Sequence, residues 1–222
     1  MNLIDKHIKA EQLRESEKFF EALELYDEVI VAYGEEKNYK GMADVLQGKV
    51  LTYKHLYLNT KEDRYYILGR ENAKAGLAIA KNHKLVEMYA SCYFRMGEME
   101  MTAGKKVEAE KYFRKAVEKQ GKSDPVWGDF AYHLGTIMCE LGKKEEGLKK
   151  MRQGMEHINK FEGKMDDYVF KVWKSGVLMK IAKADEKRRE KYMKMAKKIV
   201  YGDERLIIRK KQFEKLEGEL KV

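Results

Sequence analysis

Two glycine–lysine steps come closest, of all residues in this sequence, to a phosphate-binding loop. Gly104-Lys105 and Gly142-Lys143 are similar to the end of such a loop, in which backbone N–H groups and a lysine hold phosphate oxygens. Neither step has a glycine five residues earlier, and neither lysine is followed by Ser or Thr. Both steps are therefore predicted to be turns between helices.

The other residues that could do chemistry are two cysteines, one pair of carboxylates and the histidines. Cys92 and Cys139 lie far apart in apolar helical surroundings, which favours buried free thiols over a disulfide or a metal site. Asp166-Asp167 adjoins the start of a predicted helix, where carboxylates stabilise free N–H groups. The histidines form no i, i+4 pair and adjoin no cysteine pair, so no zinc site is expected; they are His7, His55, His83, His133 and His157. We predict no catalytic residue, no metal, no cofactor and no enzymatic activity.

The composition of the 222 residues indicates an all-α chain. There is one proline, the chain is 44% hydrophobic and 37% charged, and Val, Thr and Ile do not cluster in alternating runs. No apolar stretch is long enough to cross a bilayer, and the first residues lack the pattern of a signal peptide. We expect a cytoplasmic protein that does not contact a membrane.

Residues 96–118 and 134–156 carry the same pattern, 38 positions apart. A fixed period of this size is typical of helical hairpins that stack on one another. Small residues in the pattern let paired helices approach closely, and large ones fill the space between hairpins. The repeated residues are Gly97, Gly104, Ala109, Phe113 and Ala116, which recur as Gly135, Gly142, Gly147, Met151 and Gly154.

The helices that this pattern predicts form five antiparallel hairpins and one further helix. The helices of the second hairpin are expected to be longer than the others, and the last helix should cap the exposed apolar face of the fifth hairpin. All of residues 1–222 are expected to form a single domain. The hairpins span about residues 3–33, 39–81, 84–120, 124–159 and 165–200, and the capping helix spans about residues 204–220.

These spacings resemble the tetratricopeptide repeat (TPR) family, in a variant with a longer period than usual. In that family a small residue is followed by a turn glycine seven residues on, and then by Ala, an aromatic and Ala. The resemblance implies a right-handed α-solenoid in which the first helix of each hairpin lines a concave groove. It also implies that the residue three before the small position points into this groove; those residues are His7, Val45, Phe94, Tyr132 and Trp173.

An aromatic ladder in the groove would suit the side chains of an extended or helical peptide. The alternative is that these rings are core residues, as aromatic stripes at helical spacing usually are. Family members that clamp a C-terminal carboxylate use a lysine at the groove position and an asparagine just after the small residue. This chain has Glu11, Lys49, Glu98, Thr136 and Val177 at the latter place, so recognition of side chains is expected instead, with Arg14 in the same groove.

The net charge of +9 lies entirely in the last quarter of the chain. Residues 171–222 hold 17 Lys and Arg against 8 Asp and Glu, whereas residues 1–170 hold 29 of each. Such an excess can bind nucleic acid or an acidic partner, and the alternative is a solvated face. The residues concerned are Lys187, Lys191, Lys194, Lys198, Arg209, Lys210 and Lys211.

From these patterns we predict a non-enzymatic scaffold or adaptor that binds a peptide or partner helix in the groove. One alternative is that the basic C-terminal surface binds nucleic acid or an acidic partner. Another is a peptide-sensing regulatory module, or a subunit that forms a homodimer through the lengthened second hairpin around Tyr57 and Tyr65.

Overall fold

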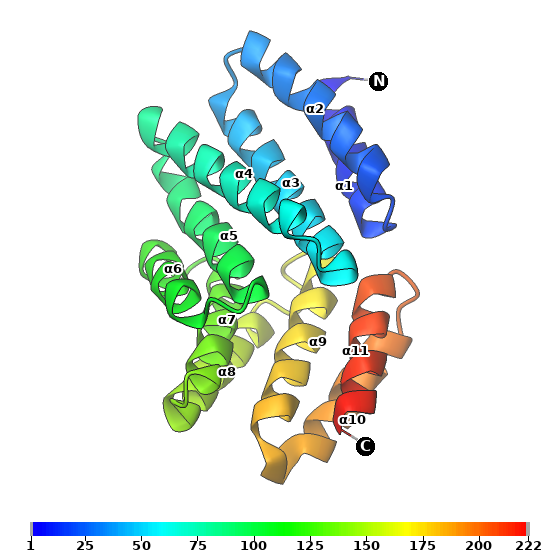
Figure 1. The fold of residues 1–222 in the computed structure, drawn as a ribbon. Helices are drawn as coiled ribbons and strands as arrows, with labels where there is room; N and C mark the ends of the chain where they lie inside the picture. Colours follow the sequence, from blue (N-terminus) through cyan, green and yellow to red (C-terminus); the bar gives the residue numbers. More distant parts are fainter. Residues whose placement is uncertain (1, 221–222) are drawn as a thin grey trace. The chain divides into compact units, whose positions relative to one another are not determined.

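The computed structural model describes residues 2–220, and every regular element among them is helical (Figure 1). The chain divides into two compact units, Met1–Lys119 and Gln120–Val222. Unit 1 contains α1 (Leu3–Glu15), α2 (Phe19–Glu35), α3 (Tyr39–Thr60), α4 (Asp63–Asn82), the 3₁₀ turn η1 (Val86–Met88), α5 (Tyr89–Thr102) and α6 (Lys106–Lys119). Unit 2 contains α7 (Val126–Glu140), α8 (Lys144–Asn159), α9 (Asp167–Ala184), the 3₁₀ turn η2 (Glu186–Arg188), α10 (Arg189–Tyr201) and α11 (Ile207–Leu220).

The five predicted hairpins are confirmed as the pairs α1–α2, α3–α4, α5–α6, α7–α8 and α9–α10. The second hairpin has longer helices, as expected, with 22 residues in α3 and 20 in α4. The first three hairpins belong to unit 1 and the last two to unit 2. The stacking of all five into one continuous array stays a prediction.

Glycine–lysine steps form turns, because Gly104 and Gly142 have φ of +76° and +84° and follow the first helices of their hairpins. Four other connections place a residue with a side chain in the same left-handed region, with φ of 61°, 56°, 62° and 56° at Glu17, Lys37, Lys61 and Lys84. Those turns have no glycine to signal them in the sequence, so only the third and fourth hairpins could be delimited in this way.

Close backbone approach holds the fourth hairpin together. A Cβ atom added at Gly135 would lie 2.5 Å from the carbonyl oxygen of Gly147, and one at Gly154 would lie 2.6 Å from that of Gly128. In the third hairpin the side chain of Phe113, which is fully buried, occupies the space beside Gly97 instead. The small and large positions of the repeat therefore pack as predicted.

The last helix, α11, packs on α9 and α10 in unit 2. Its apolar side, including Phe213 and Leu216, joins the core of that unit, and Leu206 just before it is 2% exposed. The prediction of a capping helix is confirmed. Cys92 is buried, Cys139 is half-buried, and both are free thiols.

First helices contact one another within each unit. In unit 1, α3 contacts α5 and, less extensively, α1, while the largest contacts between successive hairpins join α2 to α3 and α4 to α5. In unit 2, α7 contacts α9. We call the surface of α1, α3 and α5 the inner face of unit 1, and that of α7 and α9 the inner face of unit 2.

Candidate interaction surfaces

The residues predicted to form an aromatic ladder divide into core and surface positions. Phe94 and Tyr132 are 2% and 1% exposed, and Val45 is fully buried. His7 and Trp173 are half-buried and remain accessible. The sequence left open whether the ladder residues line a groove or belong to the core. Phe94 and Tyr132 are core residues, so their rings do not offer an open stacking surface.

Packing within each hairpin explains why these rings are buried. The ring of Phe94 lies 5.3 Å from that of Phe113, between centroids, and fills the space between α5 and α6. Tyr132 belongs to the core of unit 2, together with Met151 and Val177. Thr136 is also buried there, and its hydroxyl donates a hydrogen bond of 2.9 Å to the carbonyl oxygen of Tyr132.

Arg14 and Glu98, which were expected to point into the groove, are instead held by ion pairs within unit 1. The Arg14 guanidinium contacts Glu11 and lies 2.8 Å from Glu15, and Glu11 also accepts a hydrogen bond from the Tyr26 hydroxyl. Burial acts to raise the pKa of Glu11, but Arg14 and Tyr26 outweigh it, so the pKa lies below its usual value. The Arg14 side chain therefore stabilises unit 1 through these ion pairs.

Glu98 is nearly inaccessible, with a side chain 4% exposed, and it binds two cations. Lys54 Nζ lies 2.6 Å from Glu98 Oε1, and the Arg95 guanidinium contacts the other carboxylate oxygen. Lys49 pairs with Asp27 of α2 and keeps only 12% of its side chain exposed. The charged residues predicted for the groove therefore neutralise each other or their neighbours.

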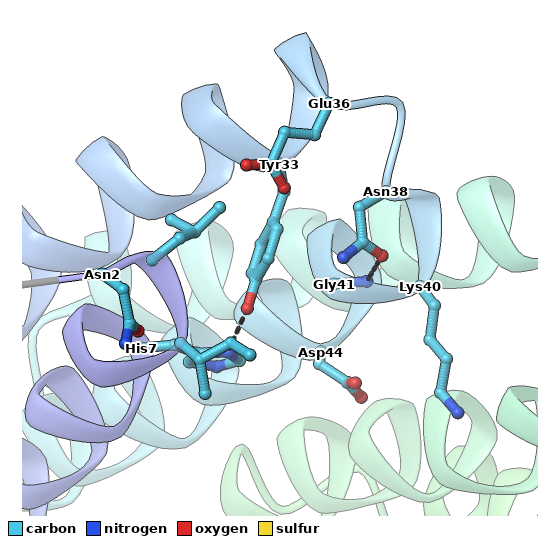
Figure 2. Close-up of a pocket in the computed structure, with 10 residues that line it drawn as sticks. Asn2, His7, Tyr33, Glu36, Asn38, Lys40, Gly41 and Asp44 are labelled. Carbon is cyan, nitrogen blue, oxygen red and sulfur yellow. Dashed lines mark hydrogen bonds between the residues drawn. The ribbon is translucent and has the colours of Figure 1, made fainter.

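A pocket of about 400 Å³ opens in unit 1 between α1, the end of α2 and the start of α3 (Figure 2). Tyr33 of α2 extends between α1 and α3, and its hydroxyl lies 3.5 Å from Nδ1 of His7. Asp44 of α3 lines the same pocket, together with Asn2, Leu3, Ile4, Glu36, Asn38, Lys40 and Gly41. His7 is the one predicted groove residue that the structure places in this pocket.

Sequence reasoning missed Asp44 and Tyr33. The available signal was the position of Asp44 inside an apolar run, Met42-Ala43-Asp44-Val45-Leu46, in which Ala43, Val45 and Leu46 are buried. A carboxylate at such a place is unusual unless it has a partner or a task.

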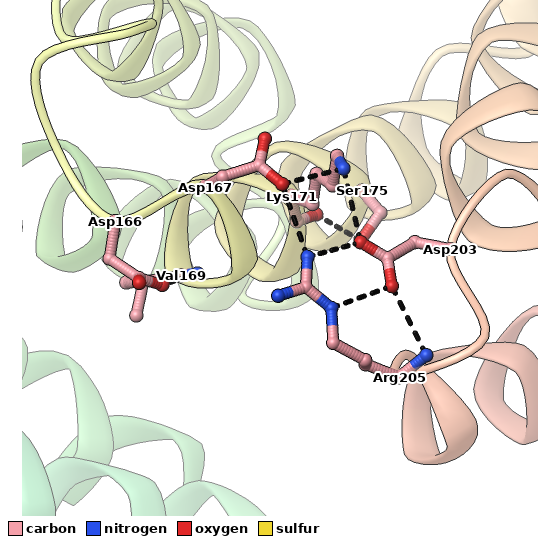
Figure 3. Close-up of polar contacts among 7 residues, drawn as sticks. All are labelled: Asp166, Asp167, Val169, Lys171, Ser175, Asp203 and Arg205. Carbon is pink, nitrogen blue, oxygen red and sulfur yellow. Dashed lines mark hydrogen bonds and ion pairs between the residues drawn. The ribbon is translucent and has the colours of Figure 1, made fainter.

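Unit 2 contains a polar cluster where α9 meets the loop before α11 (Figure 3). Asp203 binds Lys171 at 3.0 Å and Arg205 at 2.6 Å, and Asp167 binds the same two cations at 2.7 and 3.1 Å. Hydrogen bonds from Arg205 and Lys171 hold the pKa of Asp203 well below its usual value. Asp166 is the N-cap of α9 and accepts a hydrogen bond from the Val169 N–H, so the carboxylate pair serves the helix start, as expected.

The predicted basic surface is exposed at six of its seven positions. Lys187, Lys191, Lys194 and Lys198 follow one face of η2 and α10, and among residues 120–220 no ion pair joins them to a carboxylate. Lys210 and Lys211 are exposed on α11, whereas Arg209 is half-buried and its guanidinium donates to Gln212 at 2.7 Å. We call Lys187, Lys191, Lys194 and Lys198 the lysine face.

The second hairpin offers less to a homodimer than the sequence suggested. Tyr65 is 7% exposed and packs against Phe19 and Leu56 inside unit 1, and Tyr57 is half-buried. Ile67 remains 54% exposed on α4. The homodimer stays a prediction, and it would have to use residues other than Tyr65.

Two classes of site have no counterpart among residues 2–220. No group of three or more His, Cys, Asp or Glu residues there is arranged to hold a metal ion. None of the helices in that range combines the length and the apolar character that crossing a lipid bilayer requires.

No protein-family model and no curated protein matches the sequence. Solved structures do match. BtubC (BKLC) from P. vanneervenii has a TM-score of 0.62 at 18% identity, over 87% of this chain and 77% of its own. A putative kinesin light chain with nearly identical TPR-like repeats, from Podosopora anserina, has a TM-score of 0.58 at 12% identity, over 91% of this chain and 97% of its own. A second crystal structure of that kinesin light chain, of a substituted form, matches with the same TM-score and identity over 100% of this chain and 99% of its own. At identities this low, the structural likeness shows the fold alone. The protein is a chain of helical hairpins with the TPR-like repeat fold.

Proposed function

We propose that the protein is a non-enzymatic scaffold that binds a peptide or a helix of a partner protein on its inner faces. One observation carries this proposal: the first helices of unit 1 contact each other, and an open pocket with both polar and apolar side chains lies between two of them. A partner that lies across α1 and α3 would meet half-buried side chains on both helices at once. The TPR-like fold supports the proposal, because arrays of this kind present extended surfaces to partners.

Accessible residues on the inner faces replace the buried aromatics as the expected contacts. Ile4 lines the pocket and is 65% exposed, and Trp173 is half-buried on α9. Binding through such positions would combine a few apolar contacts with charge complementarity, which mainly sets selectivity and association rate.

A selection from a random-peptide library against the full chain tests this proposal. We expect the selected peptides to lose affinity on Ile4→Ser or Trp173→Ala. Phe20→Ser on α2 and Met195→Ala on α10 are matched controls, because both residues are exposed on second helices, at 62% and 38%. If no peptides are enriched, or if the controls weaken binding as much as the inner-face variants, the proposal fails.

A second candidate function is that the lysine face binds a polyanion such as nucleic acid. The specific observation is that its four lysines are exposed and, among the described residues, form no ion pair. Replacing all four with Gln should then weaken binding to a DNA or RNA oligonucleotide and reduce the dependence of affinity on salt. Four Gln substitutions at exposed lysines of unit 1 are the control, at Lys9, Lys37, Lys111 and Lys119. Equal losses in both variants would show that only net charge matters.

A further inference from the structure

Asp44 lies in the pocket of unit 1 without a partner that compensates its charge. The carboxylate is half-buried, and the contact nearest to a hydrogen bond is Gln47 Nε2 at 3.5 Å. Within residues 2–220 no ion pair joins Asp44 to a cation. Glu11 and Glu98, in contrast, are each held by at least one cation.

Charges around Asp44 do not neutralise it. His7 on α1 and Lys40 on α3 face it and favour its charged form, but Glu11 on α1 and Glu87 in η1 oppose them. Burial has the largest effect, and the pKa of Asp44 is raised above its usual value. A carboxylate in this state gains free energy from any cation that enters the pocket.

Neutral groups in the pocket suit a basic side chain. The Tyr33 hydroxyl, which lines it, can accept a hydrogen bond, and Leu3 and Ile4 give apolar surface for a methylene stem. The volume of about 400 Å³ falls in the range of small-ligand sites and exceeds the space that one side chain needs. A metal ion fits less well, because no cluster of three ligating residues is present among residues 2–220.

We propose that this pocket binds an arginine or lysine side chain of the partner, with the Asp44 carboxylate as its counter-ion. An arginine suits it better than a lysine, because the planar guanidinium can donate to both carboxylate oxygens and still reach the Tyr33 hydroxyl. This inference rests on the proposed function, since it names the partner chemistry that one part of the inner face recognises.

Nuclear magnetic resonance titration of the full chain with two small probes tests the inference. N-acetyl-arginine amide should shift the backbone signals of His7, Tyr33 and Asp44, and the citrulline analogue, which is nearly isosteric and neutral, should not. Asp44→Asn should weaken arginine binding about tenfold or more, as expected for loss of a charge-assisted hydrogen bond. Glu24→Gln is the matched control, because Glu24 is exposed on α2 and lies outside the pocket.

Stability measurements on the same variant exclude unfolding as the cause of lost binding. Because the pKa of Asp44 is raised, its charged form weakens the folded state at neutral pH, and Asp44→Asn should be at least as stable as the wild type. Equal binding of the two probes, no binding of the arginine probe, or unchanged binding by Asp44→Asn would each overturn the inference. If selected peptides bind the inner face but show no such dependence, the inference fails while the scaffold proposal stands.

Discussion

Gly135→Ala is the substitution that tests most directly how the fourth hairpin is packed. The new Cβ would lie 2.5 Å from the carbonyl oxygen of Gly147 and 2.7 Å from the backbone nitrogen of Met151. Ordinary contacts begin at 3.4 Å, so α7 and α8 would have to separate by about 0.9 Å. Neither neighbouring atom is at the end of a flexible side chain, and the hairpin cannot adapt by a change of rotamer.

The expected cost of this substitution follows from two opposing effects. Overpacking of a close contact costs about 1–3 kcal/mol, and here the upper part of that range applies because backbone atoms must move. Replacing glycine by alanine within a helix raises the free energy of unfolding by about 0.5–1 kcal/mol. We therefore expect a net loss of about 2 kcal/mol in the free energy of unfolding, which lowers the Tm by about 4–8 °C for a chain of this size.

Thermal and urea unfolding, followed by circular dichroism, measure this loss. The matched control is Gly76→Ala in α4, where the new Cβ would lie 3.6 Å from the Cβ of Leu46, an ordinary contact. This variant should be more stable than the wild type by about 0.5–1 kcal/mol. The reasoning is refuted if Gly135→Ala is as stable as the wild type, or if both variants lose stability equally.

Three further predictions concern buried charge, acid sensitivity and thiol reactivity. Glu98→Gln removes the buried carboxylate that binds Lys54 and Arg95, and it should lower the free energy of unfolding by urea by about 3 kcal/mol. Glu71→Gln at an exposed pair should lower it by less than about 1 kcal/mol, and similar losses would contradict the role of burial. Because the pKa of Asp203 is depressed in the folded state, its contribution to stability is present at neutral pH and is lost progressively as pH falls below about 4. Asp203→Asn should therefore destabilise more at pH 7 than at pH 2, and an equal effect at both values would contradict this. Burial raises the pKa of Cys92 to about 11, so little of its reactive thiolate is present at pH 8. A thiol reagent at that pH should label the half-buried Cys139 first, and faster labelling of Cys92 would refute its burial.

The sequence predicted most of the fold because local signals and packing signals coincide in this chain. The repeat of small residues and turn glycines marks the third and fourth hairpins, and Gly97 and Gly135 lie at the close contacts that their spacing indicated. The apolar side of α11 likewise predicted its packing on unit 2, where Phe213 is 1% exposed. The breaks between these hairpins were predicted, but the positive φ of Lys37 and Lys84 was not, because a lysine carries no preference for it.

The candidate sites were harder to predict, because burial depends on how far apart neighbouring helices lie. Phe94 and Tyr132 occupy the positions that the resemblance assigns to the groove, yet the packing of each hairpin encloses them. Glu98 pairs with Lys54, which is distant in sequence, whereas Arg14 pairs with Glu11 and Glu15 of its own helix. The pocket around Asp44 is lined by residues of α1, of the end of α2 and of the start of α3, and one sequence does not show how these segments come together.

α3 contacts both α1 and α5, so it links the three first helices of unit 1. A motion that widened the inner face of this unit would have to separate α3 from one of these neighbours. A ligand that bound α1 and α3 together would oppose that motion. We therefore expect that occupancy of the pocket makes unit 1 more rigid.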